Sequence, residues 1–346
     1  MKKRVVIIGG GFAGSHIAKK LEKKFDVTLV DTKNYFEFTP GILRTVVKPK
    51  HMQLITALHN SYLKKAKIVV GEVSEASREF IKVSRRKIKF DYLVVSSGST
   101  YNAPFKEQKV VIAARAKHLQ ENYSKLCKAK KVLIIGGGLV GIEMAGEIFW
   151  RYSGEKEITI VHSRSRLIQR NSEKASKYAE NFLKKRGVEI IYDDFVVDIK
   201  KTVCKTKKGL KLKADIIFLC TGIEPNYKFM KKYFLNRLSN DGFVKVNDYL
   251  QLQNEKNIFI AGDLADKKEE KTAQNAERQG KIIAKNICAL ESGNKLLKYE
   301  SKRTPLVISL GKYDGIYSGE KYVFGGIIPG LMKTIIEKFE MLKKQL

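Results

Sequence analysis

Two glycine-rich segments of this chain have the residue types and the spacing that bind the pyrophosphate of a dinucleotide. The first motif consists of Gly9, Gly11 and Gly14, and the second consists of Gly136, Gly138 and Gly141. In a GxGxxG motif the first glycine permits a tight turn, the second lets the backbone approach the phosphates, and the third lets a helix pack close to a strand. Two motifs predict two dinucleotides, most economically a flavin that stays bound and a nicotinamide that comes and goes.

Each motif is flanked by the elements that would hold it in place. Runs of β-branched residues precede the glycines, at 5–8 and 132–135, and amphipathic helical patterns follow them. The order of strand, glycine turn and helix brings the N-terminus of the helix to the pyrophosphate. There, free N–H groups and the positive end of the helix dipole favour an anion. The repeat therefore predicts two dinucleotide-binding units in one chain.

The two units differ at the end of their next strand. In the first unit the strand 27–31 ends in Asp31, where a ribose hydroxyl needs an acceptor. In the second unit the strand ends in His162, and Arg164 and Arg166 follow it without an acid. These basic residues could accommodate a 2′-phosphate, so that NADPH would be accepted as well as NADH. The alternative is a solvated basic loop in a basic protein.

Apolar strands followed by small residues close both units. The segment 90–100 contains Ser97 and Gly98, the segment 214–226 contains Gly222, and the segment 257–266 contains Asp263. The segment 257–266 is assigned to the first unit again. The second unit is therefore predicted to be inserted into the first.

The predicted fold class is α/β, with two Rossmann-like domains and a small C-terminal region. The predicted domains are a discontinuous FAD-binding domain at 1–105 and 227–298, an NAD(P)H-binding domain at 106–226, and a C-terminal region at 299–346.

The motifs GGGFAG, VTLVD, GGGLVGIEMAGEI, LCTG, AGDLAD and TAQNAERQG follow one another in that order. In this order they resemble the FAD-dependent pyridine nucleotide-disulfide oxidoreductase superfamily. Within it, the chain most resembles type II NADH:quinone oxidoreductases and apoptosis-inducing-factor-like quinone reductases of the ferroptosis-suppressor type. The resemblance runs from Lys3 to the C-terminus.

This resemblance implies roles for the matching residues. Those implied for non-covalently bound FAD are Gly9, Gly11, Gly14, Asp31, Thr39, Pro40, Val73, Ser97, Gly98, Asp263, Thr272 and Ala273. The candidates for NAD(P)H are Gly136, Gly138, Gly141 and Glu143, together with His162, Arg164 and Gly222, which are assigned from their positions after the strands. The TAQ segment would start a helix aimed at the flavin ring, and Gln274 would border the quinone site.

Glu143 is the second candidate catalytic residue. The resemblance implies a carboxylate close to the meeting point of nicotinamide and flavin, where it could orient the carboxamide or assist proton delivery. The alternative is an ordinary acid in the first turn of a helix, which contributes about 0.3–1 kcal/mol.

The cysteines narrow the choice of electron acceptor. The chain has 4, at positions 127, 204, 220 and 288, and no CxxC. A disulfide reductase is therefore not predicted, and a sulfide:quinone reductase stays an alternative in which Cys220 would have to act. The prediction is a FAD-dependent NAD(P)H:quinone oxidoreductase that pumps no protons. A further alternative is a soluble reductase of a small electron-transfer protein.

The formal charge of +31 is extreme. It is consistent with a compositional preference for lysine, with attraction to an anionic membrane, or with a flavoprotein that binds nucleic acid. No nucleic-acid motif supports the last of these, and no metal-ligand spacing is present. The chain lacks an apolar run of about 18 residues, so no spanning helix is expected. The expected location is the cytoplasm, on the inner face of a membrane.

The last 20 residues read as an amphipathic helix. Apolar residues fall at 328, 331, 332, 335, 336, 339, 342 and 346. With lysines on the polar side, this pattern predicts a helix 327–346 that lies in a membrane interface, near the quinone site. The alternative is a helix packed on its own domain or on a second subunit of a homodimer.

Overall fold

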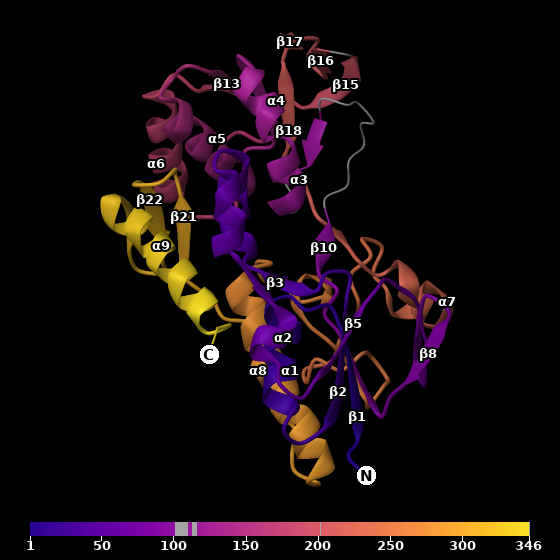
Figure 1. Ribbon diagram of the computed structural model, residues 1–346. Coiled ribbons are helices and arrows are strands. Elements are labelled where there is room, and N and C mark those ends of the chain that lie inside the picture. The colour runs from indigo at the N-terminus through magenta and orange to yellow at the C-terminus, as the bar shows by residue number, and fades with distance from the viewer. Residues whose placement is uncertain (101–109, 113–115, 201, 346) are drawn as a thin grey trace.

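The computed structural model describes residues 1–100, 110–112, 116–200 and 202–345. Two parallel β-sheets lie one above the other, and the C-terminal segment runs along one side of both (Figure 1). The predicted α/β class with two Rossmann-like units and a C-terminal strand and helix region is confirmed. The predicted domain boundaries stay a prediction.

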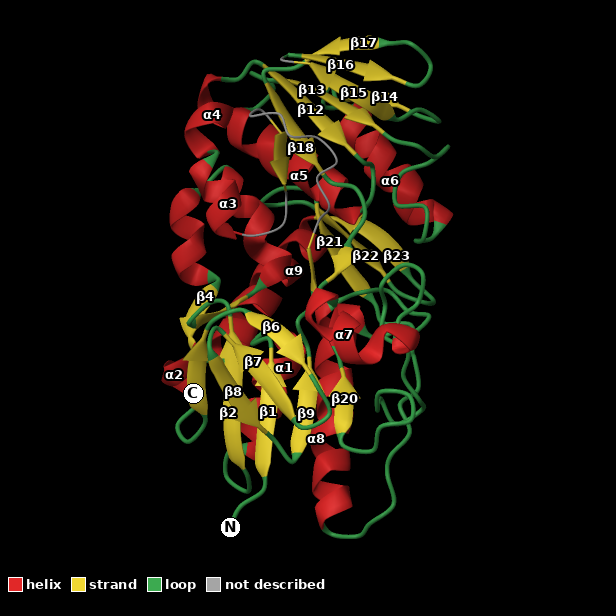
Figure 2. Ribbon diagram, turned by 90° about the vertical axis from the view of Figure 1, so that its right-hand side faces the viewer, coloured by secondary structure: helices red, strands yellow, loops and turns green. Residues whose placement is uncertain are grey.

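The first parallel sheet has the strand order β20-β9-β1-β2-β5. Its strands are β1 (Arg4–Ile8), β2 (Asp26–Asp31), β5 (Lys67–Val70), β9 (Tyr92–Val95) and β20 (Ile258–Ile260). The helices α1 (Phe12–Leu21) and α8 (Ala273–Glu291) cover one face, and the antiparallel strands β6 (Val73–Ala76), β7 (Phe80–Val83) and β8 (Arg86–Lys89) cover the other (Figure 2).

Both faces of this sheet are buried, which explains the continuous apolar run of β1. Val5 and Ile7 belong to the core shared with the helices, whereas Val6 and Ile8 belong to the core shared with the small sheet. A parallel strand covered on both sides needs apolar residues at every position.

The second parallel sheet repeats this arrangement, in the order β11-β18-β12-β13-β14. Its strands are β11 (Val110–Ile112), β12 (Lys131–Ile135), β13 (Glu157–Val161), β14 (Glu189–Ile191) and β18 (Ile216–Leu219). One face packs against α5 (Leu139–Tyr152) and α6 (Glu173–Lys184), and the other packs against β15 (Val196–Lys200), β16 (Val203–Thr206) and β17 (Lys211–Lys213).

Short elements join the two units. The chain passes from the first unit to the second and later returns. The strands β10 (Ser99–Thr100) and β19 (Glu224–Pro225) lie at these two crossings and pair with each other in a two-stranded ribbon. The other short elements before β19 are β3 (Tyr35–Glu37), η1 (Thr39–Val46), η2 (Pro49–Leu54), β4 (Thr56–Leu58), α2 (His59–Tyr62), α3 (Ala116–Glu121) and α4 (Tyr123–Lys128). Those after β19 are η3 (Lys228–Met230), α7 (Lys231–Phe234), η4 (Leu235–Arg237) and η5 (Gly262–Leu264).

The C-terminal region is an antiparallel sheet followed by one helix. Its elements are β21 (Leu306–Ser309), β22 (Gly315–Ser318), β23 (Val323–Gly326) and α9 (Ile327–Leu342). The sheet packs on α5 and α6, and α9 packs on the sheet, as the yellow segments of Figure 1 show. The helix ends at Leu342, before the predicted residue 346, and the last described residues form a turn.

Gly138 and Gly141, in the second glycine motif, allow a test of the fold. A Cβ on Gly141 would overlap the carbonyl oxygen of Gly136, whereas the Cβ position of Gly138 has no heavy atom within 4 Å. We expect Gly141→Ala to lower the free energy of unfolding by about 1–3 kcal/mol or more, as overpacking does. Gly138→Ala should cost less, about 1 kcal/mol, because only the poorer N-cap preference of Ala acts there and the Cβ meets no atom. Thermal unfolding without nucleotide measures both, and equal losses would contradict the proposed packing.

Candidate functional site

The first glycine loop has the shape of a phosphate cradle. Gly9 has φ +93°, and a Cβ there would overlap the carbonyl oxygen of Ser96. A Cβ on Gly14 would overlap the carbonyl oxygen of Gly9, so the helix packs directly on the turn. The Cβ position of Gly11, in contrast, is open. The absent side chain therefore leaves space for a ligand at the predicted position.

The second glycine loop has the same construction. Gly136 has φ +111°, and a Cβ there would lie 2.6 Å from the carbonyl oxygen of Cys220. The structure thus places Gly136, Gly138 and Gly141 as it places their counterparts in the first unit.

The helices that follow these loops have uncapped N-termini. Neither Gly11 before α1 nor Gly138 before α5 supplies a side-chain cap, whereas Thr272 before α8 accepts a hydrogen bond from the N–H of Asn275. The first N–H groups of a helix need partners from outside the helix. Both loops therefore fit a dinucleotide pyrophosphate, since its oxygens would accept from these groups.

Asp31 braces the first loop from the end of β2. Its Oδ2 accepts from the N–H of Gly10 at 2.8 Å and from His59 Nε2 at 3.2 Å, and its Oδ1 accepts from the N–H of Lys33. Burial opposes ionisation, but the hydrogen bond from His59 and the charge of Lys33 outweigh it and lower the pKa of Asp31. The carboxylate stays charged and keeps lone pairs for a ribose hydroxyl.

His162 braces the second loop in the same way, without an acid. Its Nδ1 accepts from the N–H of Gly137 at 3.1 Å, so its Nε2 carries the hydrogen and donates to the carbonyl oxygen of Arg166 at 3.1 Å. Burial, with a smaller contribution from Arg164, lowers the pKa of His162, so the ring is neutral at pH 7. Both ring nitrogens are engaged, and the ring offers a ribose no acceptor.

The two nearby arginines differ in their availability. Arg164 is exposed, whereas Arg166 donates to the carbonyl oxygens of Gln169 at 2.7 Å and Asn171 at 3.3 Å. Of these two, Arg164 is the one whose guanidinium faces solvent.

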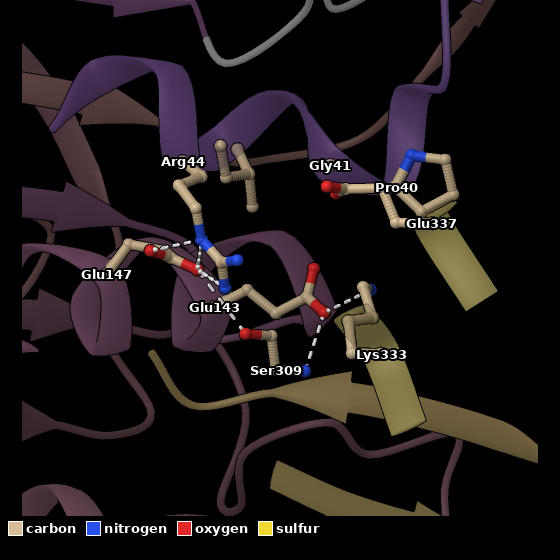
Figure 3. Close-up of a pocket in the computed structure, with 9 residues that line it drawn as sticks. Pro40, Gly41, Arg44, Glu143, Glu147, Ser309, Lys333 and Glu337 are labelled. Atoms are coloured by element: carbon tan, nitrogen blue, oxygen red, sulfur yellow. Dashed lines mark hydrogen bonds and ion pairs between the residues drawn. The ribbon is translucent and has the colours of Figure 1, made fainter. Parts of the chain in front are cut away.

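A cluster of buried charges lies where η1, α5, β21 and α9 meet (Figure 3). The residues that line this pocket are Pro40, Gly41, Leu43, Arg44, Glu143, Glu147, Ser309, Lys333 and Glu337. We call this set the charged pocket. Pro40 and Glu143, both predicted from the sequence to lie near the flavin, are brought together here from separate units.

Arg44 and Glu147 form the shortest ion pair of the charged pocket. The Nη2 of Arg44 lies 2.9 Å from Glu147 Oε1, and its Nε lies 3.1 Å from the same oxygen. The side chains are 13% and 3% exposed. Burial alone would lower the pKa of Arg44, but Glu147 and, more weakly, Glu337 and Glu143 raise it. The arginine is therefore charged, and it fastens η1 to α5.

Glu143 is bound by the C-terminal region. Its Oε1 accepts from Lys333 Nζ at 3.0 Å and from the N–H of Ser309 at 2.9 Å. The alternative of an ordinary first-turn acid is wrong, because Glu143 lies beyond the first turn of α5 and both its partners come from residues far along the chain. Glu337, one turn after Lys333 on α9, lies 3.2 Å from His51 Nε2.

The sequence reasoning missed most of these partners, namely Arg44, His51, Glu147, Ser309, Lys333 and Glu337. Two signals were present. Glu147 follows Glu143 by four residues, and Lys333 precedes Glu337 by four, so each pair shares one helix face.

The other predicted FAD residues lie at the ends of the first sheet. Ser97 Oγ donates to the carbonyl oxygen of Asn226 at 2.8 Å, and the N–H of Asn226 donates to that of Gly98. Asp263 Oδ2 accepts from Ser99 Oγ at 2.6 Å. These bonds tie both crossings to the strand ends at which the ligand site is predicted.

The remaining predicted residues are placed as follows. Thr39 starts η1, Val73 is buried in β6, Thr272 and Ala273 start α8, Gln274 is exposed beside them, and Gly222 has φ +51°.

Comparison with known proteins agrees with this geometry. The family model described as pyridine nucleotide-disulphide oxidoreductase matches residues 3–280. The chain belongs to this family. It is 36% identical to apoptosis-inducing factor homolog B of Dictyostelium discoideum over 91% of this chain and 89% of that one. It is 28% identical to ferroptosis suppressor protein 1 of Taeniopygia guttata, over 96% of this chain and 92% of that one.

The solved structure of NDH2 from Plasmodium falciparum in complex with NADH superimposes with a TM-score of 0.87. It shares 15% identity and covers 100% of this chain and 98% of its own, so it shows a shared fold. The resemblance inferred from the motifs is confirmed. The chain is a flavin-dependent NAD(P)H oxidoreductase, and the family implies FAD and NAD(P)H.

The thiols of this family member do not line the charged pocket. All four cysteines are free, and none of them lines it. Cys204 and Cys220 are buried, and burial raises the pKa of Cys204 to about 11 and that of Cys220 further. Such thiols are poor nucleophiles at neutral pH. The sulfide:quinone alternative, which needed Cys220 to act, gains no support from this placement.

A second cavity, of about 630 Å³, opens at the start of α8. It lies between the loop before α6, the loop before α8 and the C-terminal strands, and all its lining residues except Leu306 and Gly319 have polar side chains. The charged residues that line it are Arg170, Lys268, Glu269, Glu270, Lys302, Arg303 and Glu320. We call it the polar cleft. No sequence motif indicated it, because its walls come from three separate segments.

The buried ion pair of the charged pocket allows a second test. Arg44→Met should lower the free energy of unfolding by about 3–5 kcal/mol, because it leaves the Glu147 carboxylate buried without its partner. The double variant Arg44→Met, Glu147→Met should recover most of that loss. Lys67→Ala, which breaks the exposed Lys67–Asp26 pair, is the control and should leave the melting temperature unchanged. Equal melting temperatures for the single and double variants would contradict this account of the pair.

Proposed function

We propose that this chain is an FAD-dependent NAD(P)H:quinone oxidoreductase that pumps no protons. The observation that carries the proposal is the contact of Lys333 with Glu143 at 3.0 Å. It brings a cation from the C-terminal helix to the carboxylate that the family resemblance places near the nicotinamide and the flavin. The site contains no thiol, so an acceptor that needs no thiol relay fits it.

The residues proposed to hold the cofactors follow from the two cradles. We assign the domains 1–105 with 227–298 to FAD, 106–226 to NAD(P)H and 299–346 to the acceptor side. The loop and helix at Gly11 would hold the FAD pyrophosphate, and Asp31 its ribose. The equivalent loop at Gly138 would hold NAD(P)H. Bound flavin supplies the redox chemistry, since it accepts a hydride from a nicotinamide and returns two electrons to an acceptor.

The protein's own contribution is positioning and proton supply. Reduction of a quinone to a quinol consumes two protons. The Nζ of Lys333 already donates a hydrogen to Glu143 Oε1, and Arg44 fixes the neighbouring carboxylate of Glu147. A paired ammonium and carboxylate at the edge of a pocket can hold a proton ready for an acceptor oxygen.

The nicotinamide site is proposed to accept both NADH and NADPH. A carboxylate at the end of the second strand would repel a 2′-phosphate, and neutral His162 takes that position here. The exposed guanidinium of Arg164 would meet the phosphate. The imidazole of His162 still accepts the hydrogen bond from the N–H of Gly137. The absence of the acid therefore does not disturb the glycine turn.

The C-terminal helix supports a membrane-bound acceptor. Its charged residues Lys333 and Glu337 point into the protein, whereas six of its apolar residues are exposed. The exposed apolar residues are Ile327, Ile328, Leu331, Ile335, Phe339 and Leu342. An exposed apolar stripe flanked by lysines fits the interface of an anionic membrane, from which a quinone is supplied. No helix among the described residues is long and apolar enough to cross a membrane.

One observation favours the alternative of a small electron-transfer protein as acceptor. The polar cleft opens beside Thr272 at the start of α8, which is proposed to point toward the flavin. Its basic residues, in a chain of formal charge +31, would attract an acidic partner. The two candidates separate experimentally, because a protein partner gives salt-sensitive rates and needs no apolar stripe.

The proposed function is tested by anaerobic stopped-flow of the flavin absorbance near ~450 nm. We expect bleaching by both NADH and NADPH, followed by recovery with a water-soluble quinone. Glu143→Gln should slow recovery by about 10²-fold or more, as loss of a proton donor or acceptor does. Glu173→Gln, at an exposed acid in the first turn of α6, is the matched control. A protein without bound flavin, or a flavin that neither nicotinamide reduces, would contradict the proposal.

Membrane attachment is tested by co-sedimentation with vesicles that contain anionic lipid. Ile335→Glu with Phe339→Glu should weaken binding at least about tenfold, because burial of each side chain contributes about 1.5–3 kcal/mol. Leu235→Glu is the control, since Leu235 is 66% exposed and Ile335 is 65% exposed. Unchanged vesicle binding, or a dimer that the double variant dissociates, would assign the apolar stripe to a second copy of the chain instead.

A further inference from the structure

We propose that Lys344 is a positioning residue for the adenosine end of FAD, and that it acts through Tyr62 and His59 on Asp31. The inference rests on the proposed role of Asp31 in binding the FAD ribose. It gives the C-terminal turn a task that is separate from those of the charged pocket and the apolar stripe.

The side chain of Lys344 inserts into the first unit. Its Nζ lies 4.5 Å from the ring centroid of Phe36 and 4.8 Å from that of Tyr62, and it donates to Ser15 Oγ at 2.8 Å. The carbonyl oxygen of Lys344 accepts from Ser61 Oγ. A cation held by two ring faces and a hydroxyl is fixed in place. The preceding Lys343, in contrast, is exposed.

This contact crosses between parts of the molecule that are distant in sequence. Helix α9 packs mainly on the C-terminal sheet, and the chain then turns toward α1 and α2, where Figures 1 and 2 both show the C-terminus. Burial lowers the pKa of Lys344 to about 8, although Glu277 and Glu340 favour its charged form. The side chain is therefore still a cation at pH 7, as the contacts with the rings require.

Tyr62 contacts both Lys344 and His59 and so links the two side chains. The hydroxyl of Tyr62 donates to His59 Nδ1 at 2.6 Å, and the burial of this phenol raises its pKa, which keeps the hydrogen on its oxygen. Both residues are buried, at 1% and 0% exposure, so the ring of Tyr62 cannot move without moving His59. Lys19 Nζ holds the carbonyl oxygen of Tyr62 at 2.6 Å from the side of α1.

His59 in turn fixes Asp31. Because Nδ1 accepts from Tyr62, Nε2 carries a hydrogen and donates it to Asp31 Oδ2 at 3.2 Å. The same oxygen accepts from the N–H of Gly10 in the glycine loop. The chain of contacts therefore runs from the C-terminal lysine to the carboxylate and the loop that are proposed to bind FAD.

The test is FAD binding to flavin-free full-length protein, followed by flavin fluorescence. We expect Lys344→Ala to raise the Kd for FAD about tenfold, the lower end of what loss of an orienting partner costs in metal sites. Lys344→Arg should restore it to within about twofold, since guanidinium also stacks on aromatic rings. Lys343→Ala is the matched control and should leave the Kd unchanged.

Two further measurements separate positioning from general stability. FMN lacks the adenosine half, so its Kd should be the same for Lys344→Ala and the unmodified protein. Tyr62→Phe, which keeps the ring and removes the hydroxyl, should raise the Kd for FAD without adding to the effect of Lys344→Ala. Equal losses for FAD and FMN, together with a lower melting temperature of the flavin-free protein, would overturn the inference in favour of a structural role.

Asp31→Asn distinguishes failure of the inference from failure of the proposed site. If Asp31→Asn weakens FAD binding and Lys344→Ala does not, the inference is wrong and the FAD site stands. If neither variant changes the Kd, the assignment of Asp31 to the FAD ribose is wrong as well.

Discussion

The buried charges between η1, α5 and α9 are the constraint on which the rest of this structure depends. Arg44, Glu143, Glu147, Lys333 and Glu337 come from three separate elements, and each would be costly to bury without a partner. Together they lock η1 of the first unit to α5 of the second, and the C-terminal helix to both. The pairing therefore fixes how the two nucleotide-binding units face each other.

The same pairing determines the orientation of the C-terminal helix. Because Lys333 and Glu337 must reach Glu143 and His51, α9 turns the side that carries these two residues inward. The apolar stripe is left in solvent, although Ile336 and Met341 pack toward the core, as the apolar side of a surface helix usually does. One set of ion pairs thus couples the proposed proton-handling residues to the surface proposed to meet the membrane.

The two glycine loops share one backbone shape, although different dinucleotides are proposed to bind them. In each loop a side chain at or directly after the end of the next strand accepts a hydrogen bond from a backbone N–H. The carboxylate of Asp31 accepts from Gly10, and the imidazole of His162 accepts from Gly137. The brace needs only an acceptor, which both groups supply. The charge that discriminates between nucleotides can therefore change while the loop keeps its shape.

The sequence by itself determined the fold class, both glycine cradles, Asp31, and the helical stripe at the C-terminus, because each depends on local spacing. It also indicated Glu143, as a residue of the GIEMAGE motif. Only the tertiary structure decided that Glu143 meets Lys333, that Arg44 meets Glu147, and that Lys344 reaches Tyr62. It also decided which side of α9 faces solvent. The physical reason is that periodicity shows that a helix has two faces, whereas the buried partners of its charged face lie in elements hundreds of residues away.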